Sequence, residues 1–188
     1  MKKNNYQFYN PAIKKYGISA KGVRWNSKYS QYKRFEVLTN FIENEIKESH
    51  IVDAGCGFAE YYNYLFDNNL KPKSYIGIDC EEEMITLASK RFLDTNFYIK
   101  DIIKDELIFA DYYICSGAMN ILKKDEIFIF IKKCFEASNI GFVFNFLKND
   151  PLTNVNFLDI LHYSKSLSKR VEIKEDYLEN DISIFIKK

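Results

Sequence analysis

The stretch that decides the fold is Ile51-Val52-Asp53-Ala54-Gly55-Cys56-Gly57. Its two β-branched residues begin a short buried strand, and the strand ends in an acidic residue followed by two glycines. Two glycines at a strand-to-helix turn allow a ligand to approach the backbone closely. The unpaired N–H groups of the next helix then face that ligand. By itself this pattern predicts a nucleotide-type loop of low specificity.

The segments around this loop alternate between strand and helix patterns. Apolar residues at helical spacing predict helices over about 27–47, 59–70, 81–92 and 124–136. Strands are expected at 51–53, 75–79, 97–99, 111–115 and 140–146, followed by a helix near 157–164 and a hairpin of strands at 170–173 and 182–186. This alternation predicts an α/β fold with a doubly wound Rossmann-like sheet. We expect seven strands, five of them parallel, a C-terminal antiparallel hairpin and helices on both faces.

Composition limits the classes of protein that the chain can represent. The 188 residues suit a single domain spanning 1–188, and 47% hydrophobic with 28% charged residues exclude wholesale disorder. A net charge of +1 lacks the basic excess that nucleic-acid binding favours. No apolar run is long enough for a membrane span, and no apolar stretch follows the basic start, so no signal peptide is expected.

The four cysteines show no CxxC spacing, and only two histidines are present, so we expect no metal site. Well-spaced cysteines in a chain with a good core predict reduced thiols and a cytoplasmic location.

Acidic residues close two further strands of the expected sheet. Asp79 ends the second strand and Asp101 the third, while residues 116–120 follow the fourth. Ligands of such sheets bind beyond the carboxyl ends of the strands. A strand-end aspartate taken singly more often caps a helix, but three of them behind a glycine turn favour a ligand site. Glu60 replaces the third glycine of a dinucleotide loop. Its charge disfavours a pyrophosphate, and with it a nicotinamide cofactor.

Residues 51–57 resemble the first motif of the class I S-adenosylmethionine-dependent methyltransferases. Asp79 and Asp101 resemble that family's ribose and adenine motifs, and residues 110–116 are similar to its fourth motif. The resemblance covers about residue 33 to the C-terminus. It implies S-adenosylmethionine as cofactor and methyl transfer as the reaction.

The resemblance also implies roles for individual residues. The loop Gly55-Cys56-Gly57 would contact the methionine part, supported by Asp53. Asp79 would bind the ribose, and Cys80 would lie beside the adenine. Asp101 and the Ile102 N–H would hold the adenine amino end, and Ser116 would lie near the sulfonium. The family often has a third glycine where this chain has Ala59.

The N-terminal block, from Tyr16 to Glu36, resembles the lead-in of a poorly characterised bacterial subgroup of small-molecule methyltransferases. Arg34 can hold a carboxylate with two parallel hydrogen bonds, so we expect it to bind the methionine carboxylate; a solvated Arg34 is the alternative. Trp25, Asn26 and Asn120 are candidate acceptor-binding residues, although Trp25 can equally anchor the N-terminal segment and Asn120 a turn. We expect residues 1–30 to form part of a lid over the active site.

The sequence therefore predicts a methyltransferase that acts on a small molecule, with a sugar or another cell-surface metabolite as the suggested acceptor. An RNA or protein methyltransferase is one alternative, and a non-catalytic cofactor-binding subunit is another. No catalytic base is assigned, because His162 lies in a helix pattern that favours a structural role. Neither a membrane nor a nucleic-acid partner is expected, and the chain is expected to be a monomer or a homodimer.

Overall fold

The computed structural model describes Pro11, Lys15 and residues 27–149 and 155–188. The expectations for Trp25 and Asn26, and most of the proposed lid over 1–30, lie outside the described residues.

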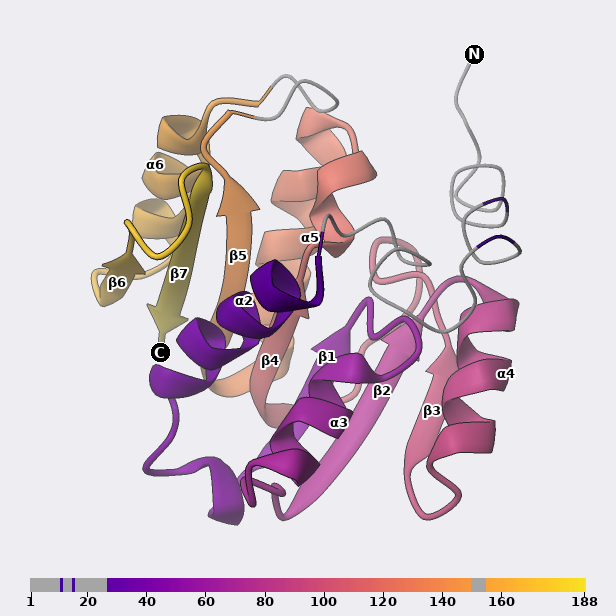
Figure 1. Ribbon diagram of the computed structural model, residues 1–188. Coiled ribbons are helices and arrows are strands. Elements are labelled where there is room, and N and C mark those ends of the chain that lie inside the picture. The colour runs from indigo at the N-terminus through magenta and orange to yellow at the C-terminus, as the bar shows by residue number, and fades with distance from the viewer. Residues whose placement is uncertain (1–10, 12–14, 16–26, 150–154) are drawn as a thin grey trace.

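A single sheet of seven strands forms the centre of the molecule (Figure 1). Its order is β3-β2-β1-β4-β5-β7-β6. The strands are β1 (His50–Ala54), β2 (Ser74–Asp79), β3 (Asn96–Ile99), β4 (Ala110–Ser116), β5 (Ser138–Leu147), β6 (Val171–Lys174) and β7 (Asp181–Lys187). Strands β1 to β5 pair in parallel, and β7 runs antiparallel to both β5 and β6. The predicted fold class, including the C-terminal hairpin, is confirmed.

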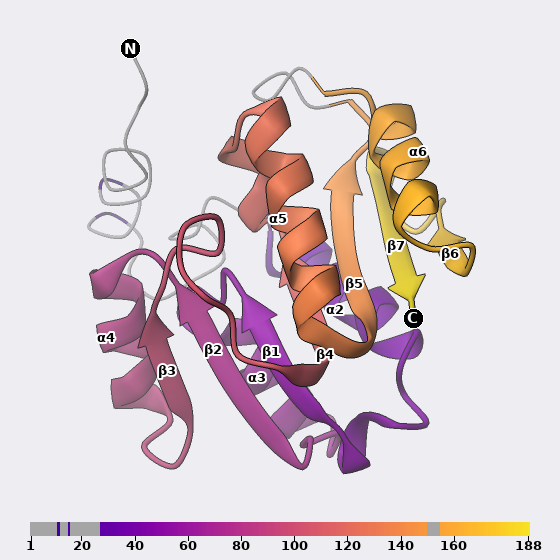
Figure 2. The same cartoon turned by 180° about the vertical axis from the view of Figure 1, so that it is seen from behind.

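Helices cover both faces of the sheet. α2 (Lys28–Asn40), α3 (Glu60–Asp67) and α4 (Glu82–Arg91) contribute to one buried cluster, and α5 (Lys124–Ala137) and α6 (Phe157–Leu167) to another. Figure 1 shows α2 and α3 in front of the sheet, and Figure 2 shows α5 and α6 in front of the opposite face. Two short 3-10 helices, η1 (Ile46–Glu48) and η2 (Ala118–Ile121), complete the described helices.

The first described helix is shorter than the sequence predicted. It starts at Lys28, with the Ser27 side chain accepting the Ser30 N–H, but it ends at Asn40 instead of near residue 47. The apolar residues that suggested a longer helix, Ile42 and Ile46, are buried all the same, by turns and by η1. Apolar residues buried in these turns therefore recur at the same spacing as residues on one face of a helix.

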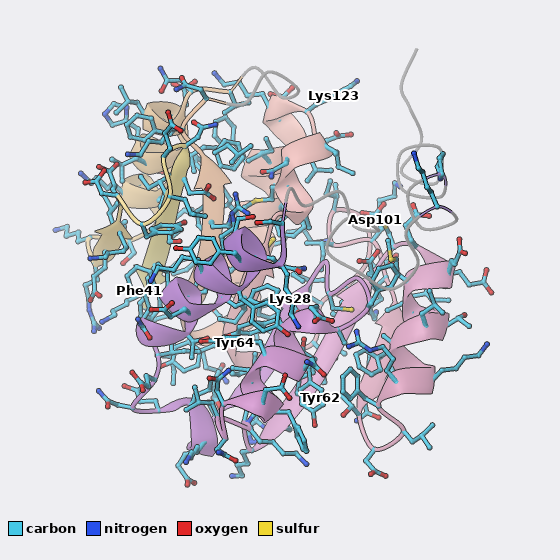
Figure 3. The ribbon with its side chains drawn as sticks, viewed as in Figure 1. Lys28, Phe41, Tyr62, Tyr64, Asp101 and Lys123 are labelled. Atoms are coloured by element: carbon cyan, nitrogen blue, oxygen red, sulfur yellow. The ribbon has the colours of Figure 1, made fainter. Side chains whose placement is uncertain are left out.

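Aromatic side chains fill much of the space between α2, α3 and the sheet. Tyr32 of α2 packs edge-on against Tyr64 of α3, with ring centroids 5.5 Å apart, and Phe41, just after α2, packs against Phe185 of β7 at 5.8 Å. Tyr64 and Phe41 are labelled in Figure 3. These contacts help to hold α2 on the half of the sheet that β4, β5 and β7 form. The abundance of aromatics in the composition thus serves core packing.

The strand order creates a crevice between β1 and β4, at the carboxyl ends of the parallel strands. The chain leaves β1 towards β2 on one side, whereas β4 pairs with β1 on the other. Ligands of open α/β sheets bind at this switch point, beyond the carboxyl ends of the strands. The loop at Gly55 lies there.

Candidate functional site

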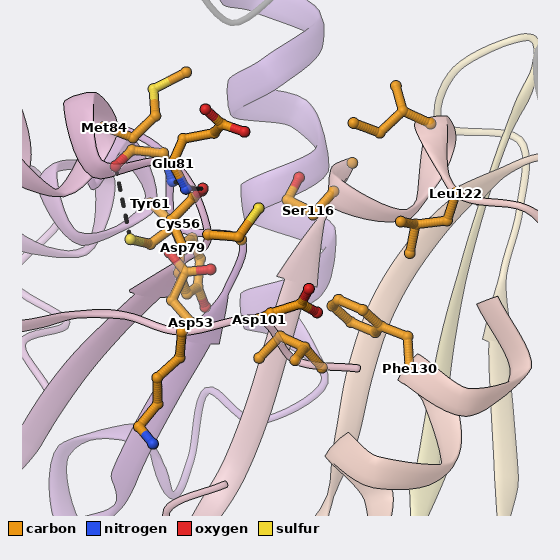
Figure 4. Close-up of a pocket in the computed structure, with 18 of the residues that line it drawn as sticks. Asp53, Cys56, Tyr61, Asp79, Glu81, Met84, Asp101, Ser116, Leu122 and Phe130 are labelled. Carbon is orange, nitrogen blue, oxygen red and sulfur yellow. Dashed lines mark hydrogen bonds between the residues drawn. The ribbon is translucent and has the colours of Figure 1, made fainter. Parts of the chain in front are cut away.

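A cavity of about 740 Å³ lies beyond the carboxyl ends of β1 to β4. Its volume is within the usual range for small-molecule sites. The lining includes nine of the residues predicted to bind the cofactor: Asp53, Gly55, Cys56, Gly57, Asp79, Cys80, Asp101, Ile102 and Ser116. Figure 4 shows Asp53 and Asp79 grouped on one side, Leu122 and Phe130 on the other, and Ser116 between them.

The glycine loop takes a backbone conformation that few residues adopt easily. Gly55 has φ +81° and Gly57 has φ +53°. The N–H groups of Gly55 and Cys56 both donate to the Ile78 carbonyl oxygen, which ties the loop to β2. Ala59 also has a positive φ of 61°, which explains why glycine is common there in the family that the sequence resembles. The loop therefore keeps its shape despite Ala59.

Asp79 holds this loop from the end of β2. Its carboxylate accepts the Gly57 N–H at 2.9 Å and the Glu81 N–H at 3.0 Å. Burial raises the pKa of Asp79, and these backbone N–H groups oppose the shift. The Cys80 N–H also bonds this carboxylate, and its remaining acceptor capacity is available to a ligand hydroxyl. Capping and ligand binding, the two alternatives for a strand-end aspartate, are therefore compatible in Asp79.

Asp101 shapes the turn after β3 in the same way. Its carboxylate accepts the Ile103 N–H at 2.9 Å and the Lys104 Nζ at 2.5 Å. Burial alone would raise the pKa of Asp101, but the bonds from Lys104 and the Ile103 N–H outweigh it and lower that pKa. Asp101 thus stays charged at the cavity wall.

Asp53 is the most deeply buried carboxylate of the site. It is 3% exposed on β1, and the Tyr75 hydroxyl donates to its Oδ2 at 2.5 Å. Burial is the main cause that raises the pKa of Asp53 to about 7, although the Tyr75 hydrogen bond opposes it. Asp53 is consequently a group that changes charge near neutral pH.

We expect this raised pKa to make the stability of the fold depend on pH. Between pH 5 and 6.5 the folded Asp53 keeps its proton while the unfolded one has lost it, so stability falls as pH rises. Asp53→Asn retains the acceptor for Tyr75 and cannot ionise, so it should remove this part of the slope. The difference in unfolding free energy between variant and parent should grow by at most about 1.4 kcal/mol per pH unit. Urea unfolding at several pH values measures it, and parallel curves for the two proteins would contradict the assignment.

Acidic side chains dominate the described lining. Seven carboxylic residues line the cavity against two lysines: Asp53, Glu60, Asp79, Glu81, Asp101, Asp105 and Glu126 against Lys100 and Lys104. The Glu60 carboxylate is partly neutralised by Arg91, at 2.9 Å, and accepts the Tyr32 hydroxyl at 3.1 Å. Such a cavity suits a ligand with positive charge and hydroxyl groups, and it repels phosphates.

Arg34 has a different partner from the one that the sequence suggested. Its Nε and Nη2 bind the two carboxylate oxygens of Asp181, at 2.5 and 2.7 Å, and it does not line the cavity. The expected planar recognition of a carboxylate is present, but the carboxylate belongs to the start of β7. This contact fixes α2 to the sheet, and a role of Arg34 in cofactor binding stays a prediction.

The remaining predicted residues have mixed outcomes. Asn120 lies in η2 beside the cavity and is not a lining residue, so its acceptor role stays a prediction. His162 is exposed on α6 and lies outside the lining, and the structural role expected for it stays a prediction.

Sequence reasoning missed the lining residues that tertiary packing brings in. Tyr61 comes from α3 and Phe130 from α5. The helical pattern alone could have indicated their faces, but it could not indicate which part of each face reaches the cavity.

Comparison with known proteins agrees with this geometry. No family model matches the chain. It is 23% identical over 184 residues to a protein of Invertebrate iridescent virus 6 named Putative methyltransferase 235L, covering 87% of this chain and 68% of the relative.

Two solved structures share the architecture. A TehB-like SAM-dependent methyltransferase from Corynebacterium glutamicum superposes with a TM-score of 0.70 at 18% identity, over 98% of this chain and all of the other. Magnesium protoporphyrin IX methyltransferase from Synechocystis PCC 6803, with bound SAH, gives 0.68 at 14% identity, over 84% and 82% of the two chains. The chain has the class I S-adenosylmethionine-dependent methyltransferase fold, and the resemblance seen in the sequence is confirmed at that level.

Proposed function

We propose that this protein is an S-adenosylmethionine-dependent methyltransferase that acts on a small molecule. The observation that carries the proposal is the acid-lined cavity, in which a glycine loop and two strand-end aspartates stand at the switch point of this fold. The Synechocystis relative, named for a small-molecule substrate, has the same architecture.

The residues present fit this cofactor. Asp79 keeps lone pairs for the ribose hydroxyls, and Asp101 offers an acceptor for the adenine amino group. The Gly55 backbone has no Cβ to block a close approach, and Asp53 in its ionised form, together with the partly neutralised Glu60, supplies negative charge for an ammonium or sulfonium group. Leu122 and Phe130 give an apolar wall that suits a purine ring.

When bound, S-adenosylmethionine supplies a methyl group already activated for in-line displacement. The chain then has to bind, orient and exclude water. The glycine loop and Asp79 fix one end of the cofactor, and α2 with η2 encloses the cavity around Ser116. No side chain is assigned as a base, and a hydroxyl acceptor would need one to take up its proton.

The predictions that concern the acceptor and its surroundings remain proposals. We propose a sugar or another cell-surface metabolite as acceptor, Trp25, Asn26 and Asn120 as its contacts, residues 1–30 as part of a lid, and a cytoplasmic monomer or homodimer. Among the described residues, no helix is both long and apolar enough to cross a membrane.

An acceptor screen tests the proposal. Purified protein is incubated with S-adenosylmethionine and panels of neutral metabolites, amines, bulk RNA and protein extract, and release of S-adenosylhomocysteine is measured. We expect release only with a small-molecule panel, and none from the Asp79→Ala variant. Release only with RNA or protein would support the macromolecular alternative. Cofactor binding without turnover in any panel would favour a non-catalytic subunit.

A further inference from the structure

Three polar side chains lie in one row across β4, β5 and β7. Ser116 pairs in register with Asn145, and Asn145 with Ser183. Two residues earlier on β4 and β5, the same face of the sheet carries the row Ile114, Val143 and Phe185. This row belongs to the hydrophobic cluster under α2. The face therefore changes from apolar to polar within two residues while Asn145 and Ser183 remain fully buried.

Only one member of this row has its hydrogen bond satisfied inside the fold. The Ser183 hydroxyl pairs with the Tyr177 hydroxyl at 2.8 Å. The Ser116 Oγ and both polar atoms of the Asn145 amide are buried and have no hydrogen-bond partner in the part of the chain that the structure describes. Buried polar groups are hydrogen-bonded in the large majority of cases. Two adjacent exceptions therefore mark a place where a ligand or an ordered water would complete the hydrogen bonds.

The row reaches the cavity at Ser116. Ser116 lines it, together with Gln31 and Phe35 from α2, the helix that covers this face. Neighbouring strands lie about 4.8 Å apart, so Asn145 lies directly beside Ser116, one strand further from the cavity, and is not itself a lining residue. The nearby charges, Arg34 and Asp181, neutralise each other. The described lining away from Asp53 and Asp79 includes one carboxylate, Glu126, which accepts the Lys123 N–H, so this end carries fewer charges than the end at Asp53 and Asp79.

We propose that Ser116 and Asn145 bind the methyl acceptor through a neutral hydroxyl or carboxamide group. A serine hydroxyl and an asparagine amide can each donate and accept, which matches groups that also do both. An ammonium would find no carboxylate free of its own partner here, and an anion would be repelled by the acidic lining. The inference rests on the proposed function, because it takes the cofactor to occupy the acidic end.

Side-chain amide signals give a direct test. In ¹⁵N-labelled protein saturated with S-adenosylhomocysteine, the Asn145 NH₂ signals are assigned by comparison with Asn145→Ala. Methyl α-D-glucopyranoside and acetamide serve as neutral probes, and ethylammonium and acetate as charged ones. We expect the neutral probes to shift the Asn145 signals. They should bind at least about tenfold more weakly to Asn145→Ala and Ser116→Ala, the loss of roughly one hydrogen bond.

Ser183→Ala is the matched control, because it removes a hydroxyl from the same row whose partner is Tyr177. It should bind the neutral probes as the parent does, and Asn145→Ala and Ser183→Ala should keep the parent's affinity for S-adenosylhomocysteine. Should Asn145→Ala fail to fold, Ser116→Ala decides alone. Equal binding of charged and neutral probes, or neutral binding unaffected by either variant, would overturn the inference. Failure of the parent protein to bind S-adenosylhomocysteine would instead refute the proposed function.

Discussion

Replacing Asp79 with alanine is expected to weaken the binding of S-adenosylmethionine and S-adenosylhomocysteine by about two orders of magnitude or more. The carboxylate would lose two hydrogen bonds to ribose hydroxyls, and each hydrogen bond to a charged group contributes ~1.5–3 kcal/mol. The variant also releases the Gly57 and Glu81 N–H groups, which loosens the loop that faces the methionine part. Calorimetric titration of variant and parent measures the effect.

Asp94→Ala is the matched control, since Asp94 is an exposed aspartate in the turn between α4 and β3. It should bind both ligands as the parent does. Thermal melting of the Asp79→Ala protein verifies that the fold persists. Folded protein with unchanged affinity would show that Asp79 only holds the loop, and the ribose would have to lie elsewhere.

Gly55→Ala is expected to reduce both stability and cofactor binding. A Cβ at this position would stand 2.2 Å from the Ala118 Cβ, far inside contact distance, and φ is +81°. Overpacking costs ~1–3 kcal/mol, and a left-handed conformation in an alanine costs at least ~1 kcal/mol. We therefore expect the free energy of unfolding to fall by about 2–4 kcal/mol. Binding should weaken because the same methyl group narrows the space for the ligand.

The double variant Gly55→Ala, Ala118→Gly separates the two causes. Removing the Ala118 methyl relieves the contact but leaves the strained backbone, so stability should return in part only. Urea unfolding of the two single variants and the double variant gives the coupling between the positions. A Gly55→Ala protein as stable as the parent would contradict the loop geometry described above.

Most of the fold could be predicted because its signals are local. The strand from Ile51, the acidic strand ends and the alternation of helix and strand all follow from neighbouring residues, and the sheet order agrees with them. The end of α2 could not be predicted, because Ile42 and Ile46 are buried by turns that keep helical spacing. Periodicity reports burial, and a helix is only one way to achieve it.

Only the part of the site that lies at the strand ends could be predicted from the sequence. Asp53, Asp79 and Asp101 follow from position at strand ends, where backbone direction decides what faces the ligand. The contact of Arg34 with Asp181 could not be predicted, because Asp181 lies 147 residues away and meets Arg34 only after β7 folds beside β5. Asn145 was missed for a related reason, since its lack of a partner is a property of three-dimensional packing.

The most direct test of the account is calorimetric titration of the purified chain with S-adenosylmethionine, S-adenosylhomocysteine and NAD in parallel. We predict micromolar binding of both sulfur ligands at one site and no detectable binding of NAD, whose pyrophosphate would meet Glu60 and the acidic lining. Absence of binding by both sulfur ligands would contradict the central claim. It would mean that the three strand-end aspartates serve the fold alone.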